Sequence, residues 1–214
     1  YATISTFLRM KMIGVIDYGA GNIKSVLNAL NFVDSKNDIK LITAPQELAK
    51  CKKLILPGVG AFKDAMDKLN KNNLTQAIKE HIAQNKPFLG ICLGMQLLFE
   101  KSYEFGECNG LGVFKGEILK FDETRFNAPL KVPHMGWNSC EFIKECPITK
   151  GLKQSEYFYF VHSYHAKCDD ELVLAFSDYG YKFVSAVAKD NVFGFQPHPE
   201  KSQNAGLCVL KNFI

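Results

Sequence analysis

The chain lacks any long apolar segment, any block of positive charge and any paired cysteine motif. No apolar run approaches the length of about 18 residues that a membrane-spanning helix needs, so we expect no contact with a membrane. The formal net charge is +4 over 214 residues and is scattered, so we expect no nucleic-acid partner. The 7 cysteines are odd in number and form no Cys-x-x-Cys pair, which favours reduced thiols in a cytoplasmic protein over a disulfide framework.

Motifs for common cofactors are also missing. Gly19-Ala20-Gly21 follows an apolar run, but the third glycine of a dinucleotide fingerprint would fall at Lys24. His162, His165 and Cys168 have a spacing that resembles a metal site, yet residues three apart on a strand point to opposite faces. We therefore expect no metal and no cofactor.

The order of apolar patterns predicts an α/β fold. The first half alternates strands and helices, which is typical of a mostly parallel sheet flanked by helices, and the second half is strand-rich and adds an antiparallel extension. We predict strands at 12–17, 39–43, 53–56, 86–91, 117–121, 139–143, 157–161, 172–176, 183–188 and 192–196. We predict helices at 22–32, 62–69, 74–84, 95–100 and 205–213.

The chain shows no repeat or linker, so residues 12–214 are expected to form a single domain. Residues 1–11 are set apart as an upstream or non-native extension. The chain starts at Tyr1, whereas Met10 and Met12 stand just before the first predicted strand.

Cys92 is the first candidate catalytic residue. It follows the strand predicted at 86–91, precedes a predicted helix and is bracketed by Gly90 and Gly94, as in a nucleophile elbow. A thiol at the start of a helix has a lowered pKa and therefore a larger thiolate fraction. The alternative, a buried structural cysteine, is the ordinary reading of a cysteine without these neighbours.

His198 and Glu200 supply the groups that a nucleophilic cysteine needs. His198 precedes Pro199, which restricts its backbone to the extended region. Residues two apart in an extended run point the same way, so Glu200 is expected beside the imidazole, where it fixes the tautomer. The alternative is a surface loop rich in proline and charge. Together with Cys92, the segment indicates a nucleophile, a base and an orienting carboxylate for acyl transfer through a thioester.

These residues and several further segments resemble the class I (triad) glutamine amidotransferases, in particular the glutaminase subunits of imidazole glycerol phosphate synthases. The resemblance runs from about Met12 to the end of the chain and implies a flavodoxin-like fold. Its motifs are Asp17-Tyr18-Gly19-Ala20-Gly21-Asn22, Pro57-Gly58-Val59-Gly60-Ala61-Phe62, Gly90-Ile91-Cys92-Leu93-Gly94, Pro133-His134-Met135-Gly136-Trp137-Asn138, Phe160-Val161-His162-Ser163-Tyr164 and His198-Pro199-Glu200-Lys201-Ser202. One departure is Pro197, where the family usually has an aromatic residue.

The resemblance implies further site residues. The backbone N–H groups of Val59 and Leu93 would form the oxyanion hole, with Gly60 beside the substrate. Glutamine would be held by Gln96 and Glu104, and by backbone contacts from Ser163 and Tyr164. From composition alone, Glu104 is one more solvated charge, and the 57–60 segment is an ordinary turn.

The resemblance also implies a heterodimer with a (β/α)₈-barrel cyclase subunit, which receives ammonia and forms imidazole glycerol phosphate in histidine biosynthesis. Asn22, His134, Trp137 and Lys201 would face that partner, although loop packing explains His134 and Trp137 equally well. Two alternatives remain open. One is a related glutaminase subunit that supplies ammonia for sugar amination in surface glycan synthesis. The other is a catalytically inactive interaction module, against which the intact triad argues.

Overall fold

The computed structural model describes residues 12–34 and 38–214, so the extension predicted at residues 1–11 lies outside the described part. The helices are α2 (Ile23–Val33), α3 (Pro45–Leu48), α4 (Phe62–Lys71), α5 (Leu74–Ala83), α6 (Leu93–Gln96) and α7 (Gln203–Phe213). The strands are β1 (Met12–Ile16), β2 (Asp38–Ile42), β3 (Lys53–Gly58), β4 (Phe88–Cys92), β5 (Phe99–Ser102), β6 (Cys108–Asn109), β7 (Phe114–Lys120), β8 (His134–Phe142), β9 (Ser155–His162), β10 (Tyr164–Lys167), β11 (Val173–Asp178), β12 (Lys182–Lys189) and β13 (Val192–Phe195).

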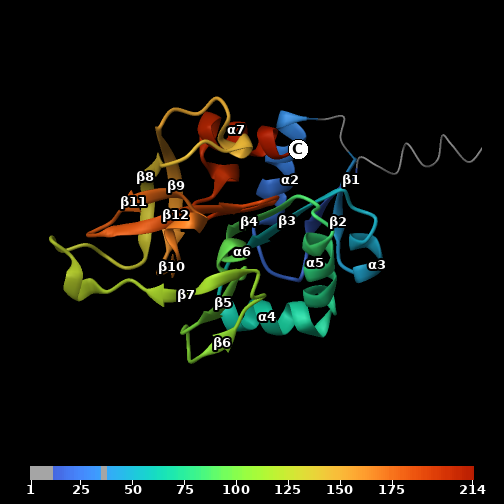
Figure 1. Cartoon of the computed structure of the whole chain (residues 1–214), viewed down its shortest axis with the longest axis horizontal. Coiled ribbons are helices and arrows are strands. Elements are labelled where there is room, and N and C mark those ends of the chain that lie inside the picture. The colour runs from blue at the N-terminus through green and yellow to red at the C-terminus, as the bar shows by residue number, and fades with distance from the viewer. Residues whose placement is uncertain (1–11, 35–37) are drawn as a thin grey trace, which may run out of the picture.

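One mixed sheet runs through the molecule in the order β2-β1-β3-β4-β13-β12-β10-β7-β5-β6. Strands β2, β1, β3, β4 and β13 are parallel to their neighbours in that series, which confirms the predicted parallel core. From β13 to β12, from β12 to β10 and from β10 to β7 the pairing is antiparallel. The parallel strands therefore all end at the same edge of the sheet (Figure 1).

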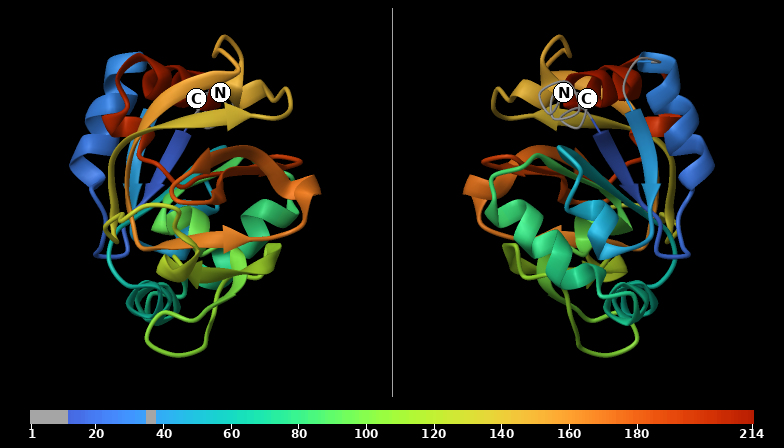
Figure 2. Two further views of the ribbon diagram at one scale, coloured as in Figure 1. Left: turned by 90° about the vertical axis from the view of Figure 1, so that its left-hand side faces the viewer. Right: turned by 90° about the vertical axis from the view of Figure 1, so that its right-hand side faces the viewer.

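Helices cover both faces of the parallel strands (Figure 2). Helices α2 and α7 contact each other on one face, where Leu30 and Leu210 belong to the same buried cluster as Ile55 of β3. Helices α4 and α5 lie on the other face, where Phe62 and Ile78 share a second cluster with Leu54 and Leu56. Successive residues of β3 thus enter opposite cores, as expected for a strand buried on both faces.

The antiparallel extension is formed by β8, β9 and β11. Strand β11 pairs with both β12 and β8, and β8 pairs with β9 from His134 opposite His162 to Glu141 opposite Ser155. Strand β8 is longer than the predicted 139–143, because its pairing with β9 begins at His134. The segment expected as a loop before Ser139 is therefore regular sheet.

The helix predicted at 95–100 is wrong beyond its first turn. Helix α6 ends at Gln96, and Phe99 already lies in β5. The carbonyl oxygens that would accept helical bonds are taken by a later segment: Leu111 N–H donates to Leu97, Val113 to Leu98, and Gly112 to Phe99. Tertiary pairing therefore overrides the helical preference of Leu97 and Leu98. Within residues 12–34 and 38–214, no helix is long and apolar enough to cross a membrane.

Candidate active site

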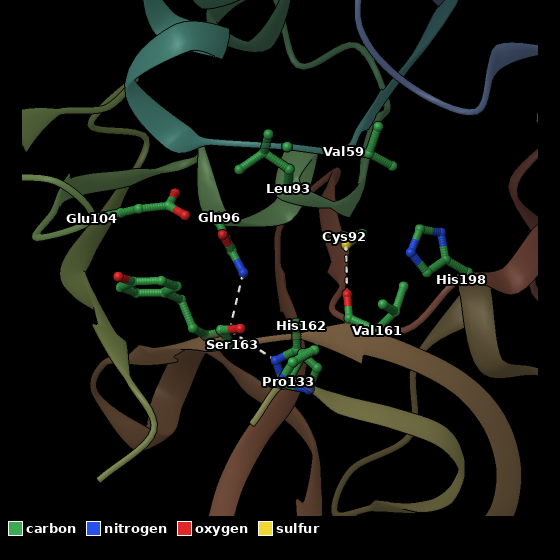
Figure 3. A pocket seen from close by; sticks show the side chains of 12 residues that line it. Val59, Cys92, Leu93, Gln96, Glu104, Pro133, Val161, His162, Ser163 and His198 are labelled. Carbon is green, nitrogen blue, oxygen red and sulfur yellow. Dashed lines mark hydrogen bonds between the residues drawn. The ribbon is translucent and has the colours of Figure 1, made fainter. Parts of the chain in front are cut away.

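The carboxyl ends of β3, β4 and β13 meet at one pocket of about 260 Å³. Gly58 pairs with Cys92 across β3 and β4, and Phe195 pairs with Ile91 across β13 and β4. The pocket is lined by Val59, Gly60, Cys92, Leu93, Gln96, Glu104, Pro133, Val161, His162, Ser163, Tyr164 and His198 (Figure 3). The pocket lies where open α/β sheets bind ligands, at the carboxyl edge of the strands.

Cys92 stands on the strained turn that its sequence predicts. Its φ of 54° is in the left-handed region, which is unusual for a residue with a side chain. The bracketing glycines have a steric reason. A Cβ on Gly94 would collide with the carbonyl oxygen of Leu56, and one on Gly90 would collide with the backbone of Gly94. The strand, the turn and helix α6 can therefore pack only with glycine at both positions.

Helix α6 is a single turn, so it carries little of the macrodipole that a longer helix would direct at the thiol. The Cys92 sulfur is instead surrounded by individual side chains and by one backbone carbonyl. Gln196 Nε2 donates to Sγ at 3.8 Å, and Sγ lies 4.0 Å from the carbonyl oxygen of Val161. Figure 3 shows the imidazole of His198 beside the sulfur. His198 is therefore the titratable side chain that Figure 3 places beside the sulfur.

His198 and Glu200 form the predicted pair, with Nδ1 of the imidazole 2.8 Å from Oε1 of the carboxylate. Both side chains are almost fully buried. The geometry differs from the predicted extended run, because Pro199–Lys201 form the 3₁₀-helix η5 and only His198 is extended. Glu200 therefore reaches the imidazole from the first turn of η5 rather than from the next position of a strand.

The pKa of His198 reflects these neighbours. Burial alone lowers the pKa of the imidazole, but the negative charges of Cys92 and Glu200 outweigh burial and raise the pKa to about 10. Nε2 of His198 is buried and has no hydrogen-bond partner within the described residues. That nitrogen is left free for the sulfur and for a substrate, as a general acid and base requires.

At the far end of the pocket, Gln96 and Glu104 are fixed by the protein itself. Gln96 Nε2 donates to the carbonyl oxygen of Tyr164 at 3.1 Å and to Gln196 Oε1 at 3.0 Å. Glu104 Oε2 accepts from the backbone N–H of Phe62 at 2.7 Å, at the start of helix α4. Figure 3 shows the amide oxygen of Gln96 on the side of the side chain that faces Glu104. Two acceptor groups are thus held near each other at this end of the pocket.

The residues expected to face a partner divide into two groups. Trp137 is 48% exposed and packs edge to face with Tyr159. Lys201 Nζ lies over the same Tyr159 ring. Asn22 is half-buried just before α2. His134, however, is only 3% exposed, and both its ring nitrogens have partners inside the sheet. Its burial does not fit the prediction that its side chain faces a partner.

Four residues that line the pocket or contact the Cys92 sulfur have no individual role among the predicted site residues: Pro133, Val161, His162 and Gln196. Gln196 carried a usable signal, since it lies two residues before His198 at the end of a predicted strand and so shares its side. For His162 the sequence offers a family motif and a metal-like spacing, neither of which gives the side chain a role at the sulfur. Among residues 12–34 and 38–214, no group of three or more His, Cys, Asp or Glu side chains is placed to hold a metal ion.

Comparison with known proteins gives the family. The glutamine amidotransferase class-I model matches residues 14–214. The imidazole glycerol phosphate synthase subunit HisH of Sulfurimonas denitrificans is 54% identical over 203 residues, covering 94% of this chain and 97% of that protein. The subunit of the same name from Methanocaldococcus jannaschii is 45% identical over 203 residues, covering 95% and 98%.

Solved structures agree on the fold. PurLQS from Thermotoga maritima aligns with a TM-score of 0.73 at 19% identity, covering 95% of this chain and 97% of that chain. The crystal structure of a glutamine amidotransferase aligns with a TM-score of 0.71 at 18% identity, covering 94% of this chain and 99% of that chain. The resemblance that the motifs indicated is therefore confirmed. The chain belongs to the class I glutamine amidotransferases and, within them, to the HisH glutaminase subunits of imidazole glycerol phosphate synthase, in histidine biosynthesis.

Proposed function

We propose that this chain hydrolyses glutamine through a thioester on Cys92 and passes the ammonia to a partner subunit. The observation that supports this most directly is the arrangement at the ends of β4 and β13. There the Cys92 sulfur faces an imidazole whose Nδ1 lies 2.8 Å from a buried carboxylate. Such an arrangement is suited to acyl transfer, because one group attacks, one moves protons and one holds the tautomer.

In this mechanism the Cys92 thiolate attacks the side-chain amide carbon of glutamine. The N–H groups of Val59 and Leu93 stabilise the oxyanion, and the first N–H of a helix such as α6 has no partner within the helix. His198 then donates its proton to the leaving nitrogen, which departs as ammonia. Water, deprotonated by the now neutral His198, attacks the γ-glutamyl thioester and releases glutamate and the thiolate.

Gly60, Gln96, Glu104, Ser163 and Tyr164 line the substrate end of the pocket. The acceptor oxygens of Gln96 and Glu104 suit the α-ammonium group of glutamine. The carbonyl oxygens of Ser163 and Tyr164 already accept bonds from within the protein. We therefore assign the backbone contacts of these two residues with glutamine to their N–H groups.

Glu104→Gln is expected to raise the KM for glutamine about tenfold or more and to change kcat less. The substitution keeps an acceptor for the Phe62 N–H but removes the negative charge, and a hydrogen bond to a charged group contributes about 1.5–3 kcal/mol. Steady-state glutaminase kinetics measure both constants. An unchanged KM would show that the carboxylate serves only to cap helix α4.

The partner is proposed to be a (β/α)₈-barrel cyclase that docks over the pocket mouth. Met135 and Trp137 leave 62% and 48% of their surface exposed on β8. Lys201 Nζ lies over the ring of Tyr159, which also contacts Trp137. Asn22 precedes α2 and follows Gly21 in the same loop. Gly21 lies near the carbonyl oxygen of Pro57, in the 57–60 segment that contains Val59. An aromatic and apolar patch beside a catalytic pocket is typical of an interface. All 7 cysteines are free, in keeping with a cytoplasmic location.

Ammonia transfer through the complex can be tested with isotopes. With amide-¹⁵N glutamine and an excess of ¹⁴N-ammonium in solution, the imidazole product is expected to carry almost undiluted ¹⁵N. The physical reason is that a buried path from the pocket to the partner keeps the ammonia out of exchange with solvent. A product labelled in proportion to the solution pool would contradict direct transfer, while glutamate release would still report the glutaminase.

A further inference from the structure

Two histidines outside the catalytic triad form a buried pair across strands β8 and β9. His134 and His162 lie opposite each other in the strand register, and His134 Nδ1 is 3.0 Å from His162 Nε2. On one side, His162 Nδ1 is 2.8 Å from the carbonyl oxygen of Tyr164. On the other side, His134 Nε2 is 3.3 Å from Asn138 Nδ2. Four groups are thus joined in one continuous chain of hydrogen bonds.

The direction of every bond in this chain is determined by chemistry. The carbonyl oxygen of Tyr164 can only accept, so His162 carries its proton on Nδ1. In a neutral ring, His162 Nε2 is then an acceptor, so His134 must donate from Nδ1 and accept at Nε2. Asn138 supplies that donor. Its amide orientation is fixed, because Nδ2 also donates to the Asp178 carbonyl and Oδ1 accepts from the Ser139 N–H.

Both imidazoles are neutral and tightly held. Burial lowers the pKa of His134 to about 4, and burial also lowers the pKa of His162 well below its ordinary value. The His134 ring is stacked on Phe160 at 4.8 Å and on Tyr179 at 4.0 Å between ring centres. Two neutral rings held in fixed orientations can pass a change of position along this series of hydrogen bonds without any change in net charge.

This series of hydrogen bonds ends at the substrate side of the active site. The Tyr164 carbonyl accepts from both His162 Nδ1 and Gln96 Nε2 (Figure 3). Gln96 Nε2 also donates to Gln196 Oε1. With both amide protons committed, the Gln96 oxygen is the atom left to face a ligand. Gln196 in turn donates to the Cys92 sulfur at 3.8 Å. The carbonyl of Tyr164 is therefore the junction between the histidine pair and the site.

We propose that His162, supported by His134, is a positioning residue for glutamine: it holds the Tyr164 carbonyl where that carbonyl sets the orientation of the Gln96 amide. This inference rests on the proposed glutaminase function. It assigns neither histidine a contact with the reacting atoms. The pair begins on β8, the same strand whose opposite face exposes Met135 and Trp137.

The kinetic test uses the complex with its partner and acceptor ligand. His162→Leu removes both bonds of the ring and is expected to raise the KM for glutamine about tenfold, the loss of one buried hydrogen bond, with a smaller change in kcat. His162→Asn places an amide donor near the position of Nδ1 and is expected to restore most of the KM. His134→Leu acts one step further away and is expected to raise the KM about threefold.

His165→Leu is the matched control. His165 is also buried against Phe121, but its Nε2 bonds to the Tyr181 hydroxyl and its Nδ1 to the Ala166 carbonyl, and neither partner lines the pocket. Its loss is expected to leave the KM for glutamine unchanged. Equal KM values in His162→Leu and the wild type, or the same rise in His165→Leu, would overturn the inference.

A second measurement does not depend on activity or on the folding of a variant. Long-range ¹H–¹⁵N spectra of the wild-type protein at neutral pH are expected to show the Nδ1–H tautomer for both His134 and His162. A proton on Nε2 of either ring would break the chain and overturn the inference. Failure of the proposed function would look different: the wild-type complex would then release no glutamate, whatever the tautomers of the two rings.

Discussion

Replacement of Cys92 by alanine is expected to abolish glutamine-dependent product formation while leaving the fold and partner binding intact. The side chain lines the pocket, and Figure 3 shows its sulfur beside the imidazole of His198. Removing the nucleophile of a comparable serine triad lowers kcat on the order of 10⁶-fold. Alanine retains the small Cβ that the φ of 54° already accommodates, so we expect little effect on the strained turn.

The control for this variant is free ammonia. If Cys92 serves only to release ammonia from glutamine, the complex of Cys92→Ala with its partner is expected to make product at the wild-type rate from added ammonium salts. The two assays share the partner, the acceptor and the product, and differ only in the nitrogen source. Glutaminase turnover by Cys92→Ala would refute the assignment of the nucleophile.

The arrangement of Cys92, His198 and Glu200 could be predicted from sequence because its constraints are local. Gly90 and Gly94 are needed where the backbone of the turn packs on itself and on Leu56, and the structure shows the clash that any Cβ would cause there. His198 is set by the proline that follows it, and Glu200 is close enough in the chain to reach the imidazole by more than one route. The predicted contact was therefore correct although η5 replaced the predicted extended run.

What could not be predicted depends on pairing between distant segments. Leu97 and Leu98 have helical preference, but bonds from 111–114 to 97–99 hold them in a turn before β5. His134 resembled a loop residue at an interface because nothing near it in sequence indicates β9, yet pairing with His162 buries it. The roles of Gln196 and His162 likewise arise only when the ends of β4, β9 and β13 come together at the pocket. Periodicity specifies an element's type, while tertiary hydrogen bonds decide where it ends.

His198→Asn is expected to lower glutaminase turnover about as far as Cys92→Ala, whereas Glu200→Gln is expected to be milder. The imidazole moves a proton in both half-reactions, so its loss blocks both. Glutamine at position 200 can donate to Nδ1 and thereby favour the wrong tautomer, an exchange that costs on the order of 10⁴-fold in a comparable triad. Steady-state kcat values for the two variants and the wild type in complex with the partner give the ranking. Full turnover without His198 would exclude the triad.

The pH dependence provides an independent check on the same two residues. Because the pKa of His198 is raised to about 10, the folded state favours the protonated ring. Its contribution to the free energy of unfolding is then complete below the ordinary pKa of about 6.5 and is lost as the pH rises through about 10.

Urea unfolding between about pH 6 and pH 10 is thus expected to show a steeper loss of stability in the wild type than in His198→Asn. Glu200→Gln is expected to lower the pKa of the ring and move the loss to lower pH. His81, whose pKa burial lowers to about 4, is the matched control: above about pH 8 its ring is neutral in both the folded and the unfolded states, so His81→Gln should keep the wild-type slope between about pH 8 and pH 10. Equal slopes in the wild type and His198→Asn would mean that the imidazole is not held protonated by Cys92 and Glu200.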